Sequence, residues 1–309
     1  MKNDKISDDI LGNGFKCLKL DLEDDNDGKQ HATLVFRNSE KQSTKAVLFV
    51  HGYIDYFFQA ELADHFNAWG YNFYAVDLRK YGRSLMAHQH PNFIENIHQY
   101  FTEIDLSFEQ MRADGNTSIT LMGHSTGGLT SSLYAHHHNN IDALILNSPF
   151  FELNESPFMI KMSAIVATLG SVFPYGKMDS LTSHYPESLH KDYKGEWDFN
   201  EEWKPTTNFP AYFGWLRAIR RAQLELQAGL DIKCPVLLMH SDKSYKGKNW
   251  DDLIYTSDAV LNVKHIDKYA DNIGSNVTKV VIKDGIHDLV LSKKEVRDNV
   301  YSVIKNWIS

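Results

Sequence analysis

The pattern in this chain that points most directly to chemistry is GHSTGG at residues 123–128. An apolar run, SITLM, precedes it and a helix-length segment follows it, so the pattern lies between a predicted strand and a predicted helix. In that context G-x-S-x-G places the serine on a sharp, strained turn, with small residues that let strand and helix approach closely. Ser125 is therefore predicted to be a nucleophile that stands above the sheet, near the amides of a helix N-terminus.

A serine hydroxyl is a weak nucleophile until a base takes its proton. The chain has 15 histidines, so the base has to be chosen by position. His287 follows the last predicted strand and precedes the last predicted helix, in a loop that opens on the same edge of the sheet as Ser125. The chain order serine, acid, histidine is also the order that this type of elbow uses. His287 is accordingly the predicted general base.

The acid that orients the histidine should come from the region after the apolar run PVLLM. Asp242 follows that run closely, whereas Asp258 lies further along the chain, just before a predicted helix that begins near Val263. Asp251 and Asp252 are weaker candidates because they lie in a polar loop. The residues alone do not decide whether Asp242 or Asp258 is the acid that orients the histidine.

Backbone amides are the expected donors to an oxyanion. The segment HGY at residues 51–53 ends the first predicted parallel strand, and Gly52 allows the backbone to approach closely. The amide of Tyr53, facing the amide of Thr126, would make the pair of donors.

Other side chains predict neither a metal site nor a nucleic-acid partner. The consecutive residues His136, His137 and His138 end a predicted helix, so their side chains fan out and indicate a solvated helix end. The net charge is −8, from 32 basic and 40 acidic residues, whereas a phosphate-binding surface needs the opposite balance. The two cysteines, Cys17 and Cys234, are too few for a disulfide framework or a Cys-rich zinc site.

The elements that must position these residues alternate between strand and helix. Residues 15–22 and 31–36 alternate as strands round the turn DDNDGK, which predicts a hairpin. Six continuous apolar runs then have the character of strands buried on both faces of a parallel sheet: AVLFV, NFYAV, SITLM, ALILN, PVLLM and KVVI. Helix-length amphipathic segments lie between most of them, at residues 59–69, 94–112, 128–138 and 263–273. This alternation predicts a doubly wound α/β sheet.

The alternation breaks once, between ALILN and PVLLM. Residues 150–231 are rich in aromatic side chains and helical where they are periodic, as in WLRAIRRAQLELQ. An insertion of this length is too long for a plain loop, so we interpret it as a helical cap over the carboxyl edge of the sheet. The predicted organisation is residues 1–149 and 232–309 as the two parts of the core, with residues 150–231 as the cap.

Length and composition limit the class of protein. With 309 residues, of which 42% are hydrophobic and 23% charged, the chain has the composition of a globular protein. Its first residues, MKNDKISDDILGNGF, hold no apolar stretch long enough for a signal peptide, which predicts a cytoplasmic protein. The most apolar later stretch, residues 157–174, contains Lys161 and is shorter than a ~20-residue span, but it leaves open a weak contact of the cap with a membrane surface. No oligomeric state is predicted.

Together these motifs resemble a known family. GHSTGG, the strand-end HGY, DLRKYGRS and GIHDL are similar to the α/β-hydrolase superfamily, and within it to the monoacylglycerol lipase and lysophospholipase-like group, also described as serine aminopeptidase-like hydrolases. The resemblance spans residues 46–309. It implies a mostly parallel eight-stranded sheet with helices on both faces and a helical cap after the sixth strand. It also implies a Ser-Asp-His esterase or lipase without metal or organic cofactor.

The chain departs from that family's pattern at two places. The family usually has H-G-x-x-D after the strand PVLLM, with the catalytic acid last, whereas HSDKS puts Ser244 at that position. Inserted residues between this strand and the acid are the simplest explanation of the departure. With such an insertion, SDAV at residues 257–260 matches the family's acid segment and its spacing to His287. The resemblance therefore favours Asp258 over Asp242. The second departure is Lys80, at a structural loop position where the family often has glycine.

The predicted activity is hydrolysis of an acyl ester through a Ser125–Asp258–His287 triad and an acyl-enzyme. The aromatic cap favours an apolar acyl group, in a monoacylglycerol, a lysophospholipid-like ester or a smaller carboxylic ester. The predicted pocket side chains are Phe158, Met159, Met162 and Phe173. Alternatives on the same triad are an acyltransferase and a peptidase. A non-enzymatic ligand-binding protein on this fold is a further alternative, although such proteins often lose a triad member.

Overall fold

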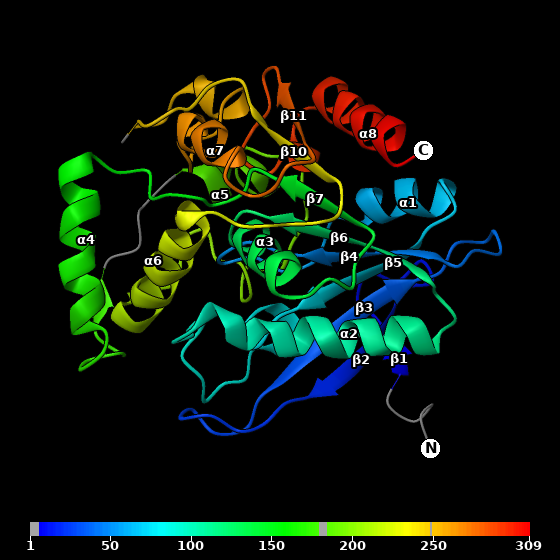
Figure 1. Ribbon diagram of the computed structural model, residues 1–309, viewed down its shortest axis with the longest axis horizontal. Helices are drawn as coiled ribbons and strands as arrows, with labels where there is room; N and C mark the ends of the chain where they lie inside the picture. Colours follow the sequence, from blue (N-terminus) through cyan, green and yellow to red (C-terminus); the bar gives the residue numbers. More distant parts are fainter. Residues whose placement is uncertain (1–5, 179–183, 248) are drawn as a thin grey trace.

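The computed structural model describes residues 6–178, 184–247 and 249–309. A twisted sheet runs through the centre of the molecule (Figure 1). In sheet order its strands are β1 (Ile6–Asp8), β2 (Lys16–Asp21), β3 (His31–Arg37), β5 (Asn72–Asp77), β4 (Lys45–Val50), β6 (Ser118–His124), β7 (Ala143–Asn147), β10 (Val236–Ser241) and β11 (Val277–Ile282). The strands from β5 to β11 pair in parallel, whereas β1, β2 and β3 pair antiparallel.

Helices cover both faces of this sheet (Figure 1). One face carries α2 (Phe101–Ala113), α3 (Thr126–His137), α6 (Phe213–Ala228) and α7 (Val263–Ala270), and the other carries α1 (Ala60–Ala68) and α8 (Lys294–Ile308). Short 3₁₀ turns are η2 (Gly82–Ser84), η3 (Ile97–Tyr100), η4 (Asp252–Tyr255) and η5 (Leu289–Leu291). Along β4, Leu48 and Val50 enter one core cluster while Val47 and Phe49 enter the other. Burial on both faces explains why this strand is a continuous apolar run.

The predicted hairpin, the six parallel strands and the predicted α/β architecture are confirmed, with two corrections. The sheet has a ninth strand among the described residues, β1, because residues 6–8 pair with β2. The run KVVI is not a strand buried on both faces. It belongs to β11, the last strand in the sheet order, where Val281 is 56% exposed.

Residues 150–231 lie between β7 and β10, and their described parts, 150–178 and 184–231, contain five elements. These are α4 (Pro157–Leu169), β8 (Lys177–Met178), α5 (Tyr185–Leu189), β9 (Ala211–Tyr212) and α6, with β8 and β9 paired in a small sheet of their own. The apolar side of α6 enters the same core cluster as α3 and the sheet, through side chains such as Trp215 and Ile219. The insertion is therefore anchored in the core by α6.

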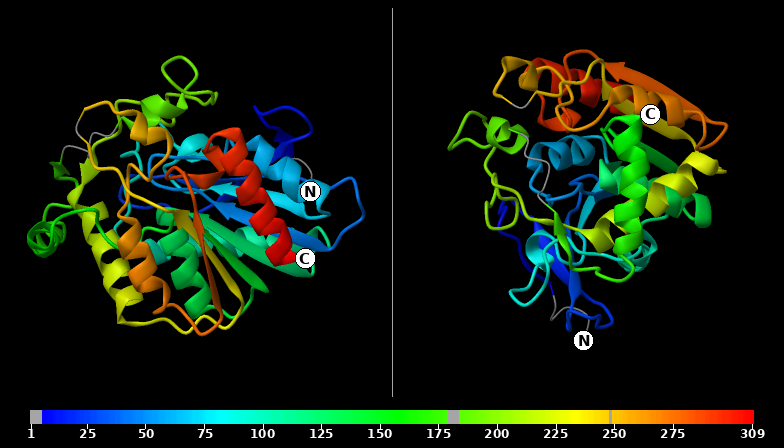
Figure 2. Two further views of the ribbon diagram at one scale, coloured as in Figure 1. Left: turned by 90° about the horizontal axis from the view of Figure 1, so that it is seen from above. Right: turned by 90° about the vertical axis from the view of Figure 1, so that its left-hand side faces the viewer.

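Helix α4 lies on the outside of α6, at the margin of the molecule (Figures 1 and 2). Among the described side chains of α4 and the turn after it, Ser163, Ala167 and Gly170 are buried, and Ile160 packs half-buried against the core. A Cβ added to Gly170 would lie 2.4 Å from the carbonyl oxygen of Phe213, so the turn after α4 approaches α6 closely. Other large apolar side chains of α4, such as Phe158 and Ile165, are exposed.

Among the described residues, no helix combines the length and the apolar character needed to cross a bilayer.

Candidate active site

Ser125 lies at the junction of β6 and α3, where its backbone is left-handed with φ 54° and ψ −116°. Such a conformation costs a non-glycine residue about 1–3 kcal/mol and persists only where the surroundings enforce it. Here packing enforces it: a Cβ added at Gly123 would lie 2.5 Å from the carbonyl oxygen of Gly127, and one at Gly127 would lie 2.2 Å from that of Val50. Only glycine fits at both positions, which explains the spacing of the motif.

His287 lies between Ser125 and Asp258. Its Nε2 is 3.0 Å from the hydroxyl oxygen of Ser125, and its Nδ1 is 3.0 Å from Oδ2 of Asp258. Because an ionised carboxylate only accepts hydrogen bonds, Nδ1 donates to it and Nε2 is left to accept from the serine hydroxyl. The three residues are at most 6% exposed, so the contacts are made in a water-poor site.

Asp258 reaches this position because the chain leaves the sheet after β10 and returns. Residues 245–247 and 249–257 belong to the excursion, and Asp258 then lies beside Ser244 in an isolated parallel bridge. The amide of Asp258 donates to the carbonyl of Lys243 at 2.9 Å, and the amide of Tyr245 donates to the carbonyl of Asp258 at 2.8 Å. The excursion thus returns Asp258 to the place next to Ser244, which the family resemblance marks for the acid.

The two carboxylate oxygens of Asp258 have separate partners. Oδ1 accepts the backbone amides of Val260 and Leu261 at 2.9 and 2.7 Å, which leaves Oδ2 facing His287. Asp258 is fully buried. A carboxylate fixed in this way can hold an imidazole in one tautomer and orientation.

Asp242, the other candidate acid, lies at the surface. It accepts the backbone amide of Asp284 at 2.8 Å, and its carboxylate is 3.7 Å from the ammonium group of Lys243. These contacts stabilise the turn that follows β10. The structure therefore brings Asp258, and not Asp242, to His287.

The segment that ends β4 lies against the serine. A Cβ added at Gly52 would be 3.1 Å from the Cβ of Ser125, so the backbone of residues 51–53 passes directly beside the elbow. Thr126 is the first residue of α3, where an amide has no acceptor inside the helix. The next residue after Gly52, Tyr53, packs its ring on Trp215 of α6 with centroids 4.1 Å apart. Both predicted oxyanion donors thus lie in segments next to Ser125.

A buried group of charges next to the serine was not predicted from the sequence. His124 Nδ1 lies 3.5 Å from Oδ2 of Asp55 and 4.0 Å from Oδ2 of Asp288, and its ring centroid is 4.9 Å from that of His287. Burial by itself would lower the pKa of His124, but the charges of Asp288 and Asp55 outweigh burial and raise this pKa above its ordinary value. Two carboxylates therefore face an imidazole that packs beside the proposed base.

Lys204 in the insertion completes this group. Its ammonium nitrogen is 2.8 Å from Oδ1 of Asp55, and both side chains are buried. Burial alone would raise the pKa of Asp55, but the charge of Lys204 and the contact with His124 outweigh it and hold this pKa well below its usual range. The ion pair of Lys204 and Asp55 connects the insertion to the loop that follows the strand end at residues 51–53.

The insertion also covers the histidine. The ring of Tyr185, on α5, lies 5.7 Å from the ring of His287, and the Tyr185 hydroxyl accepts the backbone amide of Asp288 at 2.9 Å. Asp288 in turn accepts side-chain amides from Gln59 and Asn147 at 3.1 and 2.7 Å. This network orients the loop that carries His287.

The side chains predicted to line a pocket lie at the surface. Phe158 is 70% exposed and Phe173 is 63% exposed, and Met159 and Met162 are exposed as well. Together with three neighbours they form an apolar patch, here called the α4 surface: Phe158, Met159, Met162, Ile165, Leu169, Val172 and Phe173. The structure thus shows these side chains on the outer side of α4 and the turn after it, and not packed round Ser125.

Within the described ranges of the chain, two groups of side chains have the composition and spacing to hold a metal ion. One is the buried set Asp55, His124 and Asp288, and the other is the set His98, His137 and Glu225. The interpretation of His137 as part of a solvated helix end is therefore incomplete, since its partners come from distant parts of the chain that only the fold brings together.

The family model described as serine aminopeptidase, S33, matches residues 41–294. The chain belongs to this family of hydrolases. The resemblance predicted from the motifs is thereby confirmed, and so is the α/β-hydrolase fold.

Solved structures similar to this S33 family member include two lipases and an esterase-type protein. A soluble variant of monoglyceride lipase from Saccharomyces cerevisiae, in complex with a substrate analogue, has a TM-score of 0.69 at 17% identity and covers 94% of each chain. Monoacylglycerol lipase from Paleococcus ferrophilus has a TM-score of 0.67 at 18% identity, covering 91% of this chain and 98% of its own. Est1E from Butyrivibrio proteoclasticus has a TM-score of 0.58 at 15% identity, covering 94% of this chain and 97% of its own. A search of curated proteins found no match. At these identities the likeness shows the shared fold.

The buried pair between Lys204 and Asp55 gives a test of how the insertion is attached. Replacing Lys204 by methionine keeps the bulk of the side chain and leaves Asp55 as an unpaired buried charge, which should lower the free energy of unfolding by about 3–5 kcal/mol at pH 7. Urea unfolding followed by circular dichroism measures this loss.

The same variant has a defined pH dependence. A depressed carboxyl pKa stabilises the wild type above the unfolded pKa of about 3.9, and this contribution is lost as the pH falls through the folded pKa. The gap in the free energy of unfolding between variant and wild type should therefore persist down to about pH 4 and narrow as the pH falls further. Lys191→Met, which removes an exposed ammonium paired with Asp198, is the control and should change little. Equal losses of the free energy of unfolding in Lys204→Met and Lys191→Met would show that the buried pair of Lys204 and Asp55 has no special stabilising role.

Proposed function

We propose that the protein hydrolyses carboxylic acyl esters, with Ser125 as nucleophile, His287 as general base and Asp258 as the acid that orients the histidine. The observation that carries the proposal is the pair of 3.0 Å contacts from His287 to Ser125 and to Asp258, made at a strained elbow in a chain of a hydrolase family. A serine, an imidazole and a carboxylate in this order are the components of an activated nucleophile.

The proposed reaction begins when the Ser125 oxygen attacks the ester carbonyl carbon while Nε2 of His287 takes the hydroxyl proton. The carbonyl oxygen becomes an oxyanion, for which the amides of Tyr53 and Thr126 are the proposed donors. His287 then returns the proton to the alkoxide leaving group, and the acyl-enzyme remains. Water attacks the acyl carbon with His287 again as base, and the carboxylic acid leaves.

The substrate proposed first is an ester with an apolar acyl chain, such as a monoacylglycerol or a lysophospholipid-like lipid. Its support is the apolar α4 surface on the insertion and the likeness of the fold to two monoacylglycerol-type lipases. A weak contact of the α4 surface with a lipid surface belongs to the same proposal, because exposed apolar patches of this kind mark interaction sites. Residues 150–231 then act as the cap, and the cytoplasmic location expected from the sequence remains a prediction.

A peptidase is the second candidate, since the family model carries an aminopeptidase description. An aminopeptidase needs a carboxylate to receive the free amine of its substrate. The carboxylates nearest His124 have partners already: Asp55 pairs with Lys204, and Asp288 accepts amides from Gln59 and Asn147. Ester hydrolysis therefore fits the site better than aminopeptidase activity. A panel of aminoacyl anilides distinguishes the two activities, because an aminopeptidase hydrolyses such substrates.

Ser125→Ala should lower kcat for p-nitrophenyl butyrate by ~10⁶-fold, because loss of a triad nucleophile has about that effect. A fluorophosphonate probe should label Ser125, which peptide mass spectrometry can identify. The exposed Ser171 gives the matched control, and Ser171→Ala should keep both labelling and activity. Labelling at a different serine, or activity that survives in Ser125→Ala, would exclude this nucleophile.

The choice between the two acids is tested by a pair of equal substitutions. Asp258→Asn should lower kcat by ~10⁴-fold, because an amide no longer holds the imidazole in the productive tautomer. Asp242→Asn alters only an exposed turn and should keep most of the activity. Both variants are measured with one ester at one pH, and circular dichroism checks that each is folded. An inactive Asp242→Asn beside a normal Asp258→Asn would reverse the assignment.

The proposed acyl preference is tested with p-nitrophenyl esters of increasing chain length. Each buried methylene contributes up to ~0.8 kcal/mol, so kcat/KM should rise over several chain lengths and then level off. Because Phe158 and Phe173 are exposed on the α4 surface, replacing both by serine should reduce hydrolysis of long-chain esters presented at a lipid surface and leave the soluble acetyl ester unaffected. Leu224→Ser, an equally polar change at an exposed position of α6, is the control. A strict preference for acetyl esters would contradict the lipid-like substrate.

A further inference from the structure

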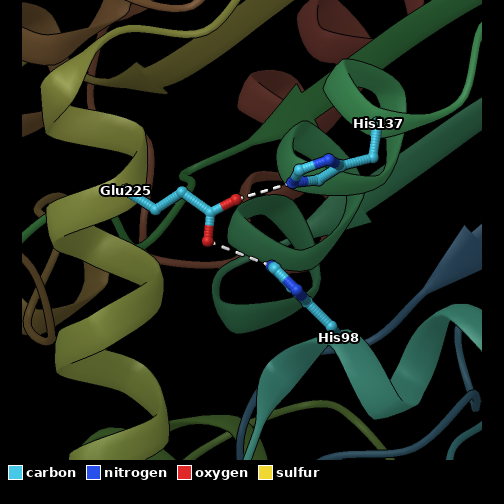
Figure 3. Close-up of side chains that lie close together, drawn as sticks. All are labelled: His98, His137 and Glu225. Atoms are coloured by element: carbon cyan, nitrogen blue, oxygen red, sulfur yellow. Dashed lines mark hydrogen bonds and ion pairs between the residues drawn. The ribbon is translucent and has the colours of Figure 1, made fainter.

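A compact set of metal-ligand side chains lies at the far end of α3 from Ser125 (Figure 3). His137 is the last residue of α3, His98 lies in η3, and Glu225 lies in the last turn of α6. Because α3 has 12 residues, its two ends are about 18 Å apart. The set is thus separate from the proposed catalytic residues.

The carboxylate of Glu225 faces both imidazoles. Its Oε1 is 2.6 Å from Nε2 of His137, and its Oε2 is 3.0 Å from Nε2 of His98. The ligand atoms of the three side chains all lie within 4.8 Å of one another. Two imidazoles and one carboxylate are a donor set that Zn²⁺ and neighbouring first-row metals bind in proteins.

The Nε2 of His98 is a buried polar atom without a hydrogen-bond partner among the described residues, although Oε2 of Glu225 is only 3.0 Å away. A bound ion would satisfy this nitrogen.

Packing holds the two rings in place. The ring of Phe101 stacks on His98 with centroids 4.8 Å apart and an interplanar angle of 21°. Phe101 also contacts the ring of His137, with the ring centroids 6.0 Å apart. The ring of His136 contacts the same His137 ring, with centroids 4.9 Å apart. Orientation of the rings before binding lowers the cost of assembling a site.

We propose that His98, His137 and Glu225 bind one divalent transition-metal ion, with zinc as the first choice. Nε2 of each histidine and one carboxylate oxygen supply three ligands, and water supplies the fourth. Bonds of about 2.0–2.2 Å in a tetrahedron place ligand atoms about 3.3–3.6 Å apart.

The ion would connect the insertion to the core. Glu225 is on α6, which packs against α3 and η3, the elements that carry the histidines, and α4 packs on α6. A metal at this point holds α6 and, through it, the α4 surface. This role is structural and does not depend on the proposed ester hydrolysis.

Calorimetric titration of ZnCl₂ into the metal-free, untagged full chain tests the site. We expect one bound zinc per chain, and at least about 10-fold weaker binding in His137→Ala and in Glu225→Gln, since loss of mere supporting contacts costs 10–100-fold. His184→Ala, which removes an imidazole that pairs with Glu187 at the surface and lies outside the set, is the control and should bind as the wild type does. Co²⁺ should give visible absorption bands of a tetrahedral ion that disappear in His137→Ala.

Absence of binding to the wild type, or equal binding by the wild type and both ligand variants, would overturn the proposal. Hydrogen exchange tests the connection separately. Zinc should slow exchange of the α6 amides in the wild type and leave them unchanged in the folded variant Glu225→Gln. Unchanged α6 exchange in zinc-loaded wild type would overturn the link between insertion and core.

Discussion

The close approach of α3 to β4 and β6 is the constraint from which the candidate site follows. With the carbonyl oxygen of Val50 2.2 Å from where a Cβ of Gly127 would lie, the chain can turn from β6 into α3 only by placing Ser125 in a left-handed conformation. That turn lifts the serine above the carboxyl edge of the sheet. The strand end at residues 51–53 is held beside it by the same contact.

The loops after β10 and β11 complete the arrangement because parallel strands end at the same edge. His287 comes from the loop after β11, and Asp258 comes from the excursion that returns beside Ser244. Backbone amides and neighbouring side chains fix both residues. The local strain at Ser125 is therefore supported by a rigid sheet and by hydrogen-bonded loops.

The insertion is both part of the core and part of the site. Helix α6 contributes Trp215 to the core cluster and packs it on Tyr53, while Lys204 pairs with Asp55 and Tyr185 covers His287. Helix α4 differs, because its small residues Ser163 and Ala167 are buried while several of its large apolar side chains, such as Phe158 and Ile165, are exposed. The insertion thus combines a part fixed by buried charges with an apolar outer surface.

The sequence alone determined the features that depend on local pattern. The glycines round Ser125, the apolar runs of the parallel strands and the position of His287 all follow from rules that act over a few residues. Asp258 was favoured over Asp242 by family spacing, whereas the bridge to Ser244 that brings it to His287 exists only in three dimensions. The tertiary structure alone decided which side of α4 is buried, since its sequence is apolar on several sides. It also decided that Lys204 meets Asp55 and that Glu225 meets His98 and His137, because side chains distant in the chain become neighbours only when the helices pack.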